Sequence, residues 1–259
     1  MSDFNFGGAV AVVTGGASGI GRALADRLGA ECARVAVVDL NGPAAAAAAA
    51  ELPGAVGLEA DVGDALAVRA MVARVEAELG PIAIYCSNAG IGTGGGLGDD
   101  GAWERSWRVH GLAHVYAARE VMPGMAARGS GALVITASAA GLLMMMQSAP
   151  YTVTKHASGA RAEWLAVNYA APGVQVHCVC PQGVRTPMVS SDPQSETEVA
   201  SSGRIIEPAV VADAVVDAVR ANRFLVLPHP EVQEYEKLKV GDRDRWLAGM
   251  RRLRGRVVG

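Results

Sequence analysis

The sequence predicts an α/β protein built on one doubly wound parallel sheet of about seven strands, with helices on both faces. Short β-branched runs alternate along the chain with longer helix-like segments. Most of these runs are continuously apolar, as expected for strands that are covered on both faces. Because no shift in composition marks a boundary, we expect residues 1–259 to form a single domain.

Strands are expected where apolar runs end at Gly, Pro or polar residues, and helices in the segments between them. Asp64 is a candidate N-cap, and Gly80 with Pro81 ends the helix that follows it. The alanine tract 44–50 is expected to be helical because alanine is the best helix former. The expected strands span residues 9–14, 34–39, 55–60, 82–86, 132–136, 174–180 and 223–227, and the expected helices span residues 20–30, 43–52, 64–79, 103–128, 151–169 and 208–221.

The composition narrows the class of protein. Hydrophobic residues make up 51% of the chain and charged residues 19%, so much surface must be buried in a core or in subunit contacts. The net charge of -3 gives no reason to expect a nucleic-acid partner. We expect no signal peptide and no membrane association, because the apolar stretches fall well short of the ~18 residues of a spanning helix.

The cysteines indicate a reducing compartment, so we expect a cytoplasmic protein. None forms a C-x-x-C pair, and each lies in an apolar run. Cys178 and Cys180 would share one face of a strand, but no second ligand pair accompanies them. We interpret them as small core residues and expect no metal site.

A glycine-rich turn joins the first expected strand to the first expected helix. Residues 15–21 read GGASGIG, a G-x-x-x-G-x-G spacing. Such a turn lets the backbone approach a pyrophosphate, whose charge then meets the positive end of the helix dipole. Glycines also cluster in ordinary turns, but the position of this turn within a βαβ unit favours dinucleotide binding in a Rossmann-like fold.

Asp39 ends the second expected strand, downstream of the glycine turn. A carboxylate here can accept both ribose hydroxyls of an adenosine and would repel a 2′-phosphate. No Lys or Arg occupies positions 16–18 or 40–41. This combination favours NAD over NADP; the alternative is that Asp39 serves only as a turn or capping residue.

Further motifs follow in order along the chain, each at the end of an expected strand or the start of a helix. Residues 61–62 (DV) end the third strand, 88–90 (NAG) follow the fourth, Ser138 follows the fifth, 151–155 (YTVTK) open a helix and 181–186 (PQGVRT) follow the sixth. Together with the glycine turn and Asp39, they resemble the classical short-chain dehydrogenase/reductase family over residues 9–186.

The resemblance implies hydride transfer between a nicotinamide and a secondary alcohol or ketone, with Tyr151 as the acid/base. A phenol with a pKa near 10 is a poor base at neutral pH. Lys155, four residues on and on the same helical face, would lower the pKa of Tyr151 together with the charge of an oxidised nicotinamide, and would hold the nicotinamide ribose. Ser138 would polarise the substrate oxygen. The alternative is that Tyr151 and Lys155 form an exposed helical pair without chemistry.

The resemblance also implies which residues bind NAD: the glycine turn holds the phosphates, and the other motifs flank the adenosine and the nicotinamide. The expected cofactor-binding residues are Gly15, Ser18, Gly19, Ile20, Gly21, Asp39, Leu40, Asp61, Val62, Asn88, Ala89, Gly90, Tyr151, Lys155, Pro181, Val184 and Thr186.

Two positions depart from the family pattern. His110 stands where the family usually carries an asparagine that relays protons to the lysine. An imidazole donates and accepts, so we expect His110 to take over this catalytic role and to make activity more pH-sensitive. His110 and His114 have a spacing that can bind zinc, but no acidic third ligand is near. Gln182 replaces a common glycine and should alter the loop near the nicotinamide.

The substrate is expected to lie against residues 141–147 (GLLMMMQ), between the serine and the tyrosine. Methionines suggest a soft, adaptable apolar wall, unless they pack into the core or a subunit contact. Polar residues around 187–206 are expected to form a mobile lid. We therefore expect a substrate with an apolar or ring body, held by Ser138, Met144, Met145, Tyr151 and Met188.

The C-terminal segment places apolar residues in roughly one helical stripe among several arginines, in the range 243–256. A basic amphipathic helix can bind membranes or acidic partners, but a subunit interface is favoured in this mildly acidic chain. Members of the resembled family are commonly tetramers, so we expect a homo-oligomer, with a homotetramer favoured.

Two functions therefore compete. The first is an NAD-dependent oxidoreductase acting on CH–OH groups. The second is a catalytically weakened NAD-binding sensor or structural protein of the same fold. His110 favours the second, whereas the intact set of Ser138, Tyr151 and Lys155 favours the first.

Overall fold

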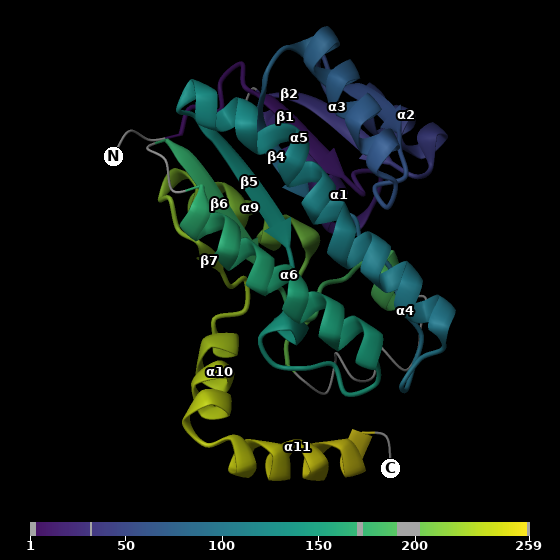
Figure 1. Cartoon of the computed structure of the whole chain (residues 1–259), viewed down its shortest axis with the longest axis vertical. Helices are drawn as coiled ribbons and strands as arrows, with labels where there is room; N and C mark the ends of the chain where they lie inside the picture. The colour runs from purple at the N-terminus through teal and green to yellow at the C-terminus, as the bar shows by residue number, and fades with distance from the viewer. Residues whose placement is uncertain (1–3, 32, 170–172, 191–202, 258–259) are drawn as a thin grey trace.

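The computed structural model describes residues 4–31, 33–169, 173–190 and 203–257 (Figure 1). Seven parallel strands form one sheet in the order β3-β2-β1-β4-β5-β6-β7, which confirms the predicted fold class. The chain runs from β1 to one edge and then restarts at β4 toward the other edge. The loops after β1 and β4 therefore diverge, which creates a crevice at the carboxyl ends of these strands.

The strands agree with the sequence expectation to within two residues at each end. Their ends fray where the apolar run meets Gly or polar residues. The strands are β1 (Val10–Thr14), β2 (Arg34–Asp39), β3 (Val56–Glu59), β4 (Ile82–Ser87), β5 (Gly131–Thr136), β6 (Val174–Val179) and β7 (Leu225–Val226).

The helices cover both faces of the sheet and extend beyond its last strand. Most were expected from the sequence; the π-helical turn η1, the 3-10 turn η2, the separate helix α4 and the helices α7 and α10 were not. The elements are α1 (Gly19–Ala30), α2 (Gly42–Ala50), α3 (Ala65–Leu79), α4 (Asp100–Ser106), η1 (Trp107–Leu112), α5 (Ala113–Arg128), η2 (Ala139–Gly141), α6 (Ala149–Asn168), α7 (Pro187–Ser190), α9 (Pro208–Arg220), α10 (Glu231–Gly241) and α11 (Arg243–Val257).

Two apolar layers hold the helices on the sheet. Helices α1, α2 and α9 bury their apolar faces against one side, and α3, α5 and α6 against the other. The strands between them are buried on both faces, which explains their continuous apolar runs. This sandwich makes the carboxyl edge of the sheet a rigid platform for the loops that leave it.

Local signals set the helix starts. The side chain of Asp64 accepts a hydrogen bond from Leu66 N at 2.8 Å, so the predicted N-cap of α3 is confirmed. Helix α6 begins at Ala149, two residues earlier than expected, because Ser148 caps it and Pro150 suits a first turn. The cap thereby fixes the start of the helix that carries Tyr151.

The C-terminal helices α10 and α11 extend away from the sheet (Figure 1). No helix in the described part of the chain is long and apolar enough to cross a membrane. Of the lid expected at residues 187–206, residues 191–202 lie outside the described residues. Residues 187–190, which begin the expected lid, form the short helix α7.

Candidate active site

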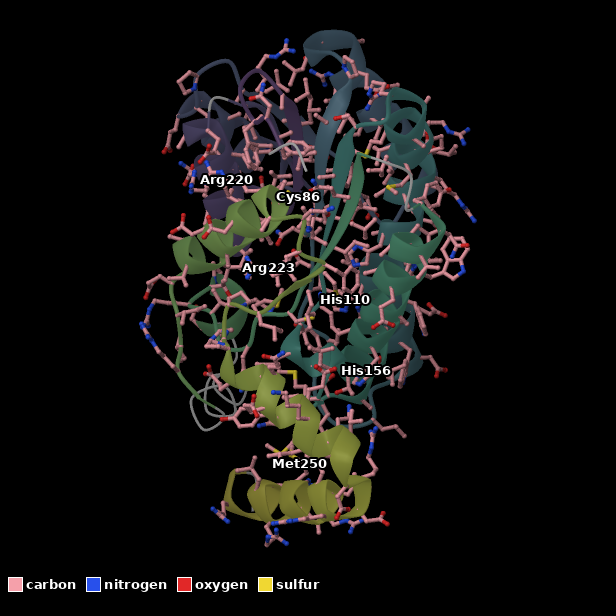
Figure 2. The ribbon with its side chains drawn as sticks, turned by 90° about the vertical axis from the view of Figure 1, so that its left-hand side faces the viewer. Cys86, His110, His156, Arg220, Arg223 and Met250 are labelled. Carbon is pink, nitrogen blue, oxygen red and sulfur yellow. The ribbon has the colours of Figure 1, made fainter. Side chains whose placement is uncertain are left out.

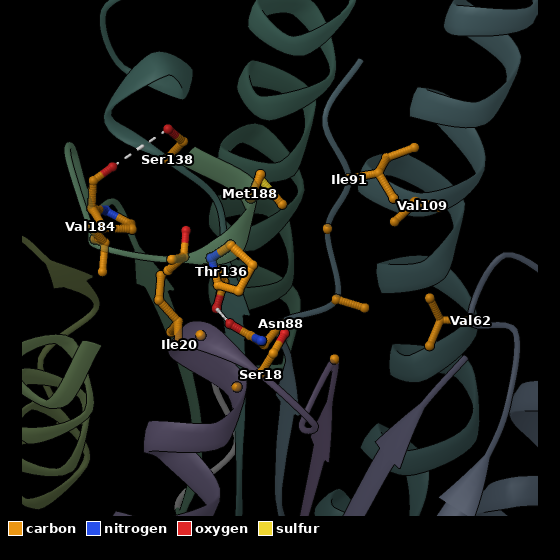
Figure 3. A pocket seen from close by; sticks show the side chains of 18 of the residues that line it. Ser18, Ile20, Val62, Asn88, Ile91, Val109, Thr136, Ser138, Val184 and Met188 are labelled. Carbon is orange, nitrogen blue, oxygen red and sulfur yellow. Dashed lines mark hydrogen bonds between the residues drawn. The ribbon is translucent and has the colours of Figure 1, made fainter. Parts of the chain in front are cut away.

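A cavity of about 380 Å³ opens at the carboxyl ends of the strands, in the crevice between the β1 and β4 loops (Figure 3). The motif residues picked from the sequence converge here from seven segments of the chain. Those that line the cavity are Gly15, Ser18, Gly19, Ile20, Gly21, Asp39, Leu40, Asp61, Val62, Asn88, Ala89, Gly90, Ser138, Tyr151, Lys155, Pro181, Val184, Thr186 and Met188.

The glycine turn after β1 has a shape that side chains would prevent. Gly15 and Gly19 adopt positive φ angles of 63° and 52°. A Cβ on Gly21 would lie 1.9 Å from the carbonyl oxygen of Gly15. The turn therefore folds tightly onto the start of α1 and leaves the backbone exposed to the cavity.

The N-terminus of α1 carries no side-chain cap and no acidic residue in its first turn. Ser18 is its N-cap residue, but the Ser18 side chain makes no capping hydrogen bond. Helices α2, α3 and α6 are each capped by a side chain. The first N–H groups of α1 and its positive dipole end are thus available to an anion at the cavity wall, which fits a pyrophosphate.

Asp39 lies where the adenosine end of a dinucleotide would reach. Its Oδ2 accepts from Ala17 N and its Oδ1 from Asn41 N, both at 3.1 Å. These bonds hold the carboxylate at the end of β2 and leave each oxygen a further lone pair. The neighbouring side chain of Leu40 is 69% exposed and lines the cavity. The site thus combines a fixed negative charge with an apolar surface.

Asn88 links three strands beneath the cavity. Its Nδ2 donates to Thr14 O at 3.0 Å, and its Oδ1 accepts from Thr136 Oγ1 at 3.1 Å (Figure 3). Its backbone N–H donates to Thr14 Oγ1 at 2.9 Å. The side chain therefore ties β4 to β1 and β5. It fixes the crevice that holds the glycine turn.

Ser138, Tyr151 and Lys155 border one end of the cavity. Ser138 follows β5, and Tyr151 and Lys155 come from the first turns of α6. The Tyr151 side chain is hydrogen-bonded to that of Ser138. The Nζ of Lys155 donates to Thr136 O at 3.0 Å and lies 5.7 Å from the centre of the Tyr151 ring. A hydroxyl, a phenol and an ammonium thus meet around one space.

The titration of this group differs from the sequence expectation. Burial raises the pKa of Tyr151 above its ordinary value, and the hydrogen bond with Ser138 offsets only part of that rise. Burial also lowers the pKa of Lys155 to about 8. Lys155 was expected to lower the pKa of Tyr151. In the structure the Lys155 ammonium bonds to the carbonyl of Thr136, and desolvation of the phenol is the main cause of the raised pKa of Tyr151.

His110 lies in the π-helical turn η1, fully buried behind the cavity wall. Its Nε2 accepts from Ile91 N at 3.1 Å, so the proton of the neutral ring is on Nδ1. That proton is donated to Thr154 Oγ1 at 3.1 Å, and Thr154 in turn donates to Pro150 O at 2.7 Å. His110 thereby connects the loop after β4 to α6.

Burial, followed by the charge of Lys155, lowers the pKa of His110 well below its ordinary value. The ring is therefore neutral throughout the neutral pH range. The expected pH sensitivity of activity does not follow from this environment, because a histidine that stays neutral changes no charge near pH 7. His110 also lies outside the residues that line the cavity.

The substrate end of the cavity is only partly as expected. Met188 lines it, whereas Met144 and Met145 are half-buried in the neighbouring loop and do not. Gln182 lines it as well, and its backbone N–H donates to His229 Nδ1 at 3.2 Å. Seven further residues that line the cavity were not selected as site residues from the sequence, although most of them lie at or after the carboxyl ends of strands. They are Ala60, Ile91, Val109, Thr136, Ala137, Pro187 and Val189.

The described residues contain no group of three metal-ligating side chains. The Sγ atoms of Cys178 and Cys180 lie 3.7 Å apart in the core, and their mutual hydrogen bond together with burial raises the pKa of Cys178. His114 Nδ1 pairs with Ser87 Oγ at 2.7 Å. These groups are therefore packed or hydrogen-bonded within the fold.

Comparison with known proteins gives the same picture. Residues 9–197 match the family model described as short chain dehydrogenase. The chain is 33% identical to 1-deoxy-11-beta-hydroxypentalenate dehydrogenase of Streptomyces exfoliatus, over 86% of this chain and 84% of that protein. It is 32% identical to 2-(S)-hydroxypropyl-CoM dehydrogenase 3 of Xanthobacter autotrophicus, over 80% and 88% of the two chains.

A solved structure extends the likeness to nearly the whole fold. It is a short chain dehydrogenase/reductase from Burkholderia phymatum in complex with NAD. The two chains superpose with a TM-score of 0.87 at 26% identity, over 93% of this chain and 96% of the other.

Proposed function

The chain belongs to the short-chain dehydrogenase family, and from this premise we propose that it is an NAD-dependent oxidoreductase that interconverts a secondary alcohol and a ketone. The observation that carries the proposal is the meeting of Ser138, Tyr151 and Lys155 at one end of a cavity whose other end is a glycine turn and an uncapped helix. The substrate would bind at the end of the cavity where these three residues meet, and the dinucleotide would lie along the remainder of the cavity.

The residues present fit NAD. The uncapped N–H groups of α1 suit the pyrophosphate, and the tight approach of Gly21 to Gly15 leaves room for it. The carboxylate of Asp39 suits two ribose hydroxyls and disfavours a 2′-phosphate. Lys155 would hold the other ribose. When bound, the nicotinamide donates or accepts the hydride.

The protein's own part is to move one proton. In the oxidation direction the phenolate of Tyr151 takes the hydroxyl proton of the alcohol; in reduction the phenol returns a proton to the carbonyl oxygen. Ser138 donates a hydrogen bond to the same oxygen and stabilises the charge that develops there. A positive Lys155 beside the ring stabilises the phenolate, which offsets the burial that otherwise keeps Tyr151 protonated.

The substrate end suggests an apolar or ring-containing body. Met188 and Val189 line the cavity beside Ser138, and residues 144–146 add methionines in the adjoining loop. Flexible thioethers suit a bulky apolar group of variable shape.

Turnover with both cofactors tests this function. The protein is mixed with NAD or NADP and a panel of small and alicyclic secondary alcohols, and formation of the reduced cofactor is followed by absorbance. We expect turnover with NAD on at least one alicyclic alcohol and much slower turnover with NADP. Tight NADH binding without turnover on any alcohol would instead support the sensor or structural protein.

The proposal includes a single catalytic domain over residues 1–259, in a homotetramer in the cytoplasm. Large apolar side chains on the outer face of α6 support a subunit contact, since Trp164 is 58% and Val167 75% exposed. Cys86, Cys178 and Cys180 are free and buried, as suits a reducing compartment.

A further inference from the structure

Lys239 on α10 is a buried lysine that does not line the catalytic cavity, with only 7% of its surface exposed. Its Nζ donates to Leu142 O at 2.6 Å, to Leu143 O at 2.8 Å and to His156 Nε2 at 3.2 Å. An ammonium has three N–H donors, and all three find acceptors here. A buried charge held in this way fixes its partners firmly.

All three acceptors belong to the stretch of residues 138–156, which carries Ser138, Tyr151 and Lys155 at the cavity. The two carbonyls lie between Ser138 and Tyr151, and His156 directly follows Lys155. Figure 2 places His156 at the end of the body nearest the C-terminal helices. Lys239 thus joins α10 to this segment.

The acceptor role of His156 is fixed by its other nitrogen. Its Nδ1 lies 2.8 Å from Thr152 O, which can only accept, so the ring proton is on Nδ1 and Nε2 is free to accept from Lys239. The Nζ of Lys239 also lies 5.3 Å from the centre of the Trp246 ring. Helix α11 therefore also contacts the ammonium, through the Trp246 ring.

The loop of residues 142–147 is consequently held at both ends. Lys239 binds its first two carbonyls. At its far end Gly96 N donates to Gln147 O at 2.6 Å, and Ala149 N donates to Gly96 O at 2.9 Å. Between these points Met145 N donates to the side chain of Thr152 at 3.0 Å. The methionines between the ends are thereby carried on a backbone that α10 and α11 help to place.

We infer that Lys239 is a specificity-determining positioning residue: through the carbonyls of Leu142 and Leu143, the C-terminal helices fix the methionine loop and so set which substrate bodies the site accepts. The inference rests on the proposed function. It assigns α10 and α11 a role in substrate selection, in addition to any role in subunit contacts.

Lys239→Met tests this with Lys237→Met as the matched control. Lys237 lies on the same helix but is exposed. Among the described residues its one ion pair is with Glu234, whose Oε1 lies 2.7 Å from Lys237 Nζ. Loss of a charged hydrogen bond should raise KM for a bulky alicyclic alcohol by about tenfold, with less effect on a small alcohol. We expect kcat and the Kd for NADH to stay within about threefold, and Lys237→Met to match the parent.

Hydrogen exchange gives a second readout that needs no turnover. Amides in residues 142–147 should exchange faster in Lys239→Met than in Lys237→Met, at unchanged exchange in the sheet. If Lys239→Met fails to fold, His156→Phe, which removes one acceptor and keeps the lysine, should give a smaller change in the same direction.

Unchanged exchange of the loop, an equal rise in KM for small and bulky alcohols, or a matching loss of NADH affinity would overturn the inference. Absence of turnover in the parent protein with every alcohol would instead overturn the proposed function, and the exchange experiment would still decide the role of Lys239.

Discussion

At the scale of single residues, the site depends on a lysine that is costly to bury. Lys155 is 3% exposed, and burial lowers its pKa from 10.5 to about 8. Between these two pH values the unfolded chain binds more protons at this residue than the folded chain does. The free energy of unfolding therefore rises, through Lys155, as the pH rises from about 8 to 10.5.

Lys155→Met makes this measurable. Relative to the variant, the parent protein should gain up to about 3 kcal/mol of unfolding free energy between pH 8 and pH 10.5, because each pKa unit corresponds to about 1.4 kcal/mol. Loss of the hydrogen bond to Thr136 O changes the unfolding free energy of the variant by a constant amount and does not change how the difference between the two proteins varies with pH. Parallel stability curves from chemical denaturation over that range would contradict the burial of a charged Lys155.

Asp39 should decide the choice of cofactor. Asp39→Ser removes the carboxylate that faces the ribose end, and the ratio of kcat/KM for NAD to that for NADP should fall by at least about tenfold. Asp26→Asn, an equal change of charge on α1 in a pair with Arg22, should leave the ratio unchanged. A ratio that does not move would show that Asp39 only shapes the turn it caps.

His110 should act as a structural link between the loop and α6. His110→Asn loses the ring that joins Ile91 to Thr154, so we expect a lower kcat and a lower Tm. The pH–rate profile should keep its shape because His110 is neutral near pH 7. A profile whose pKa shifts in the variant would restore the proton-relay role expected from the sequence.

At the scale of elements, the strands, most helices and the glycine turn were predictable because apolar runs and local capping signals lie within a few residues of one another. The turn η1 was not, since π-helical turns are rare and residues 103–128 read as one continuous helix. The contacts of His110 and Lys239 join segments far apart in the chain. Local sequence patterns carry no signal for such pairs.

The glycine turn gives the prediction at this scale. Gly21→Ala would place a methyl group 1.9 Å from Gly15 O, so the turn must open and NADH binding should be lost. Gly249→Ala is the control: it lies inside α11, a Cβ there would meet only the end of the Arg252 side chain at 3.8 Å, and binding should stay intact. Normal NADH affinity in Gly21→Ala, measured by fluorescence titration, would show that the turn does not hold the cofactor.

At the scale of the whole molecule, the exposed apolar face of α6 predicts a subunit contact. Trp164→Glu would bury a charge in that contact, so sedimentation should show smaller species than the parent protein. Val210→Glu, on the exposed side of α9, serves as the control. A parent protein that sediments only as a monomer would contradict the proposed tetramer.

The central claim is that a phenol beside a buried ammonium moves the proton of the reaction, and Tyr151→Phe tests it most directly. The substitution keeps the ring that packs near Lys155 and removes only the hydroxyl. We predict that kcat for alcohol oxidation falls by about 10²- to 10⁴-fold while the Kd for NADH stays within about twofold. A phenylalanine variant that turns over at the parent rate would contradict the account.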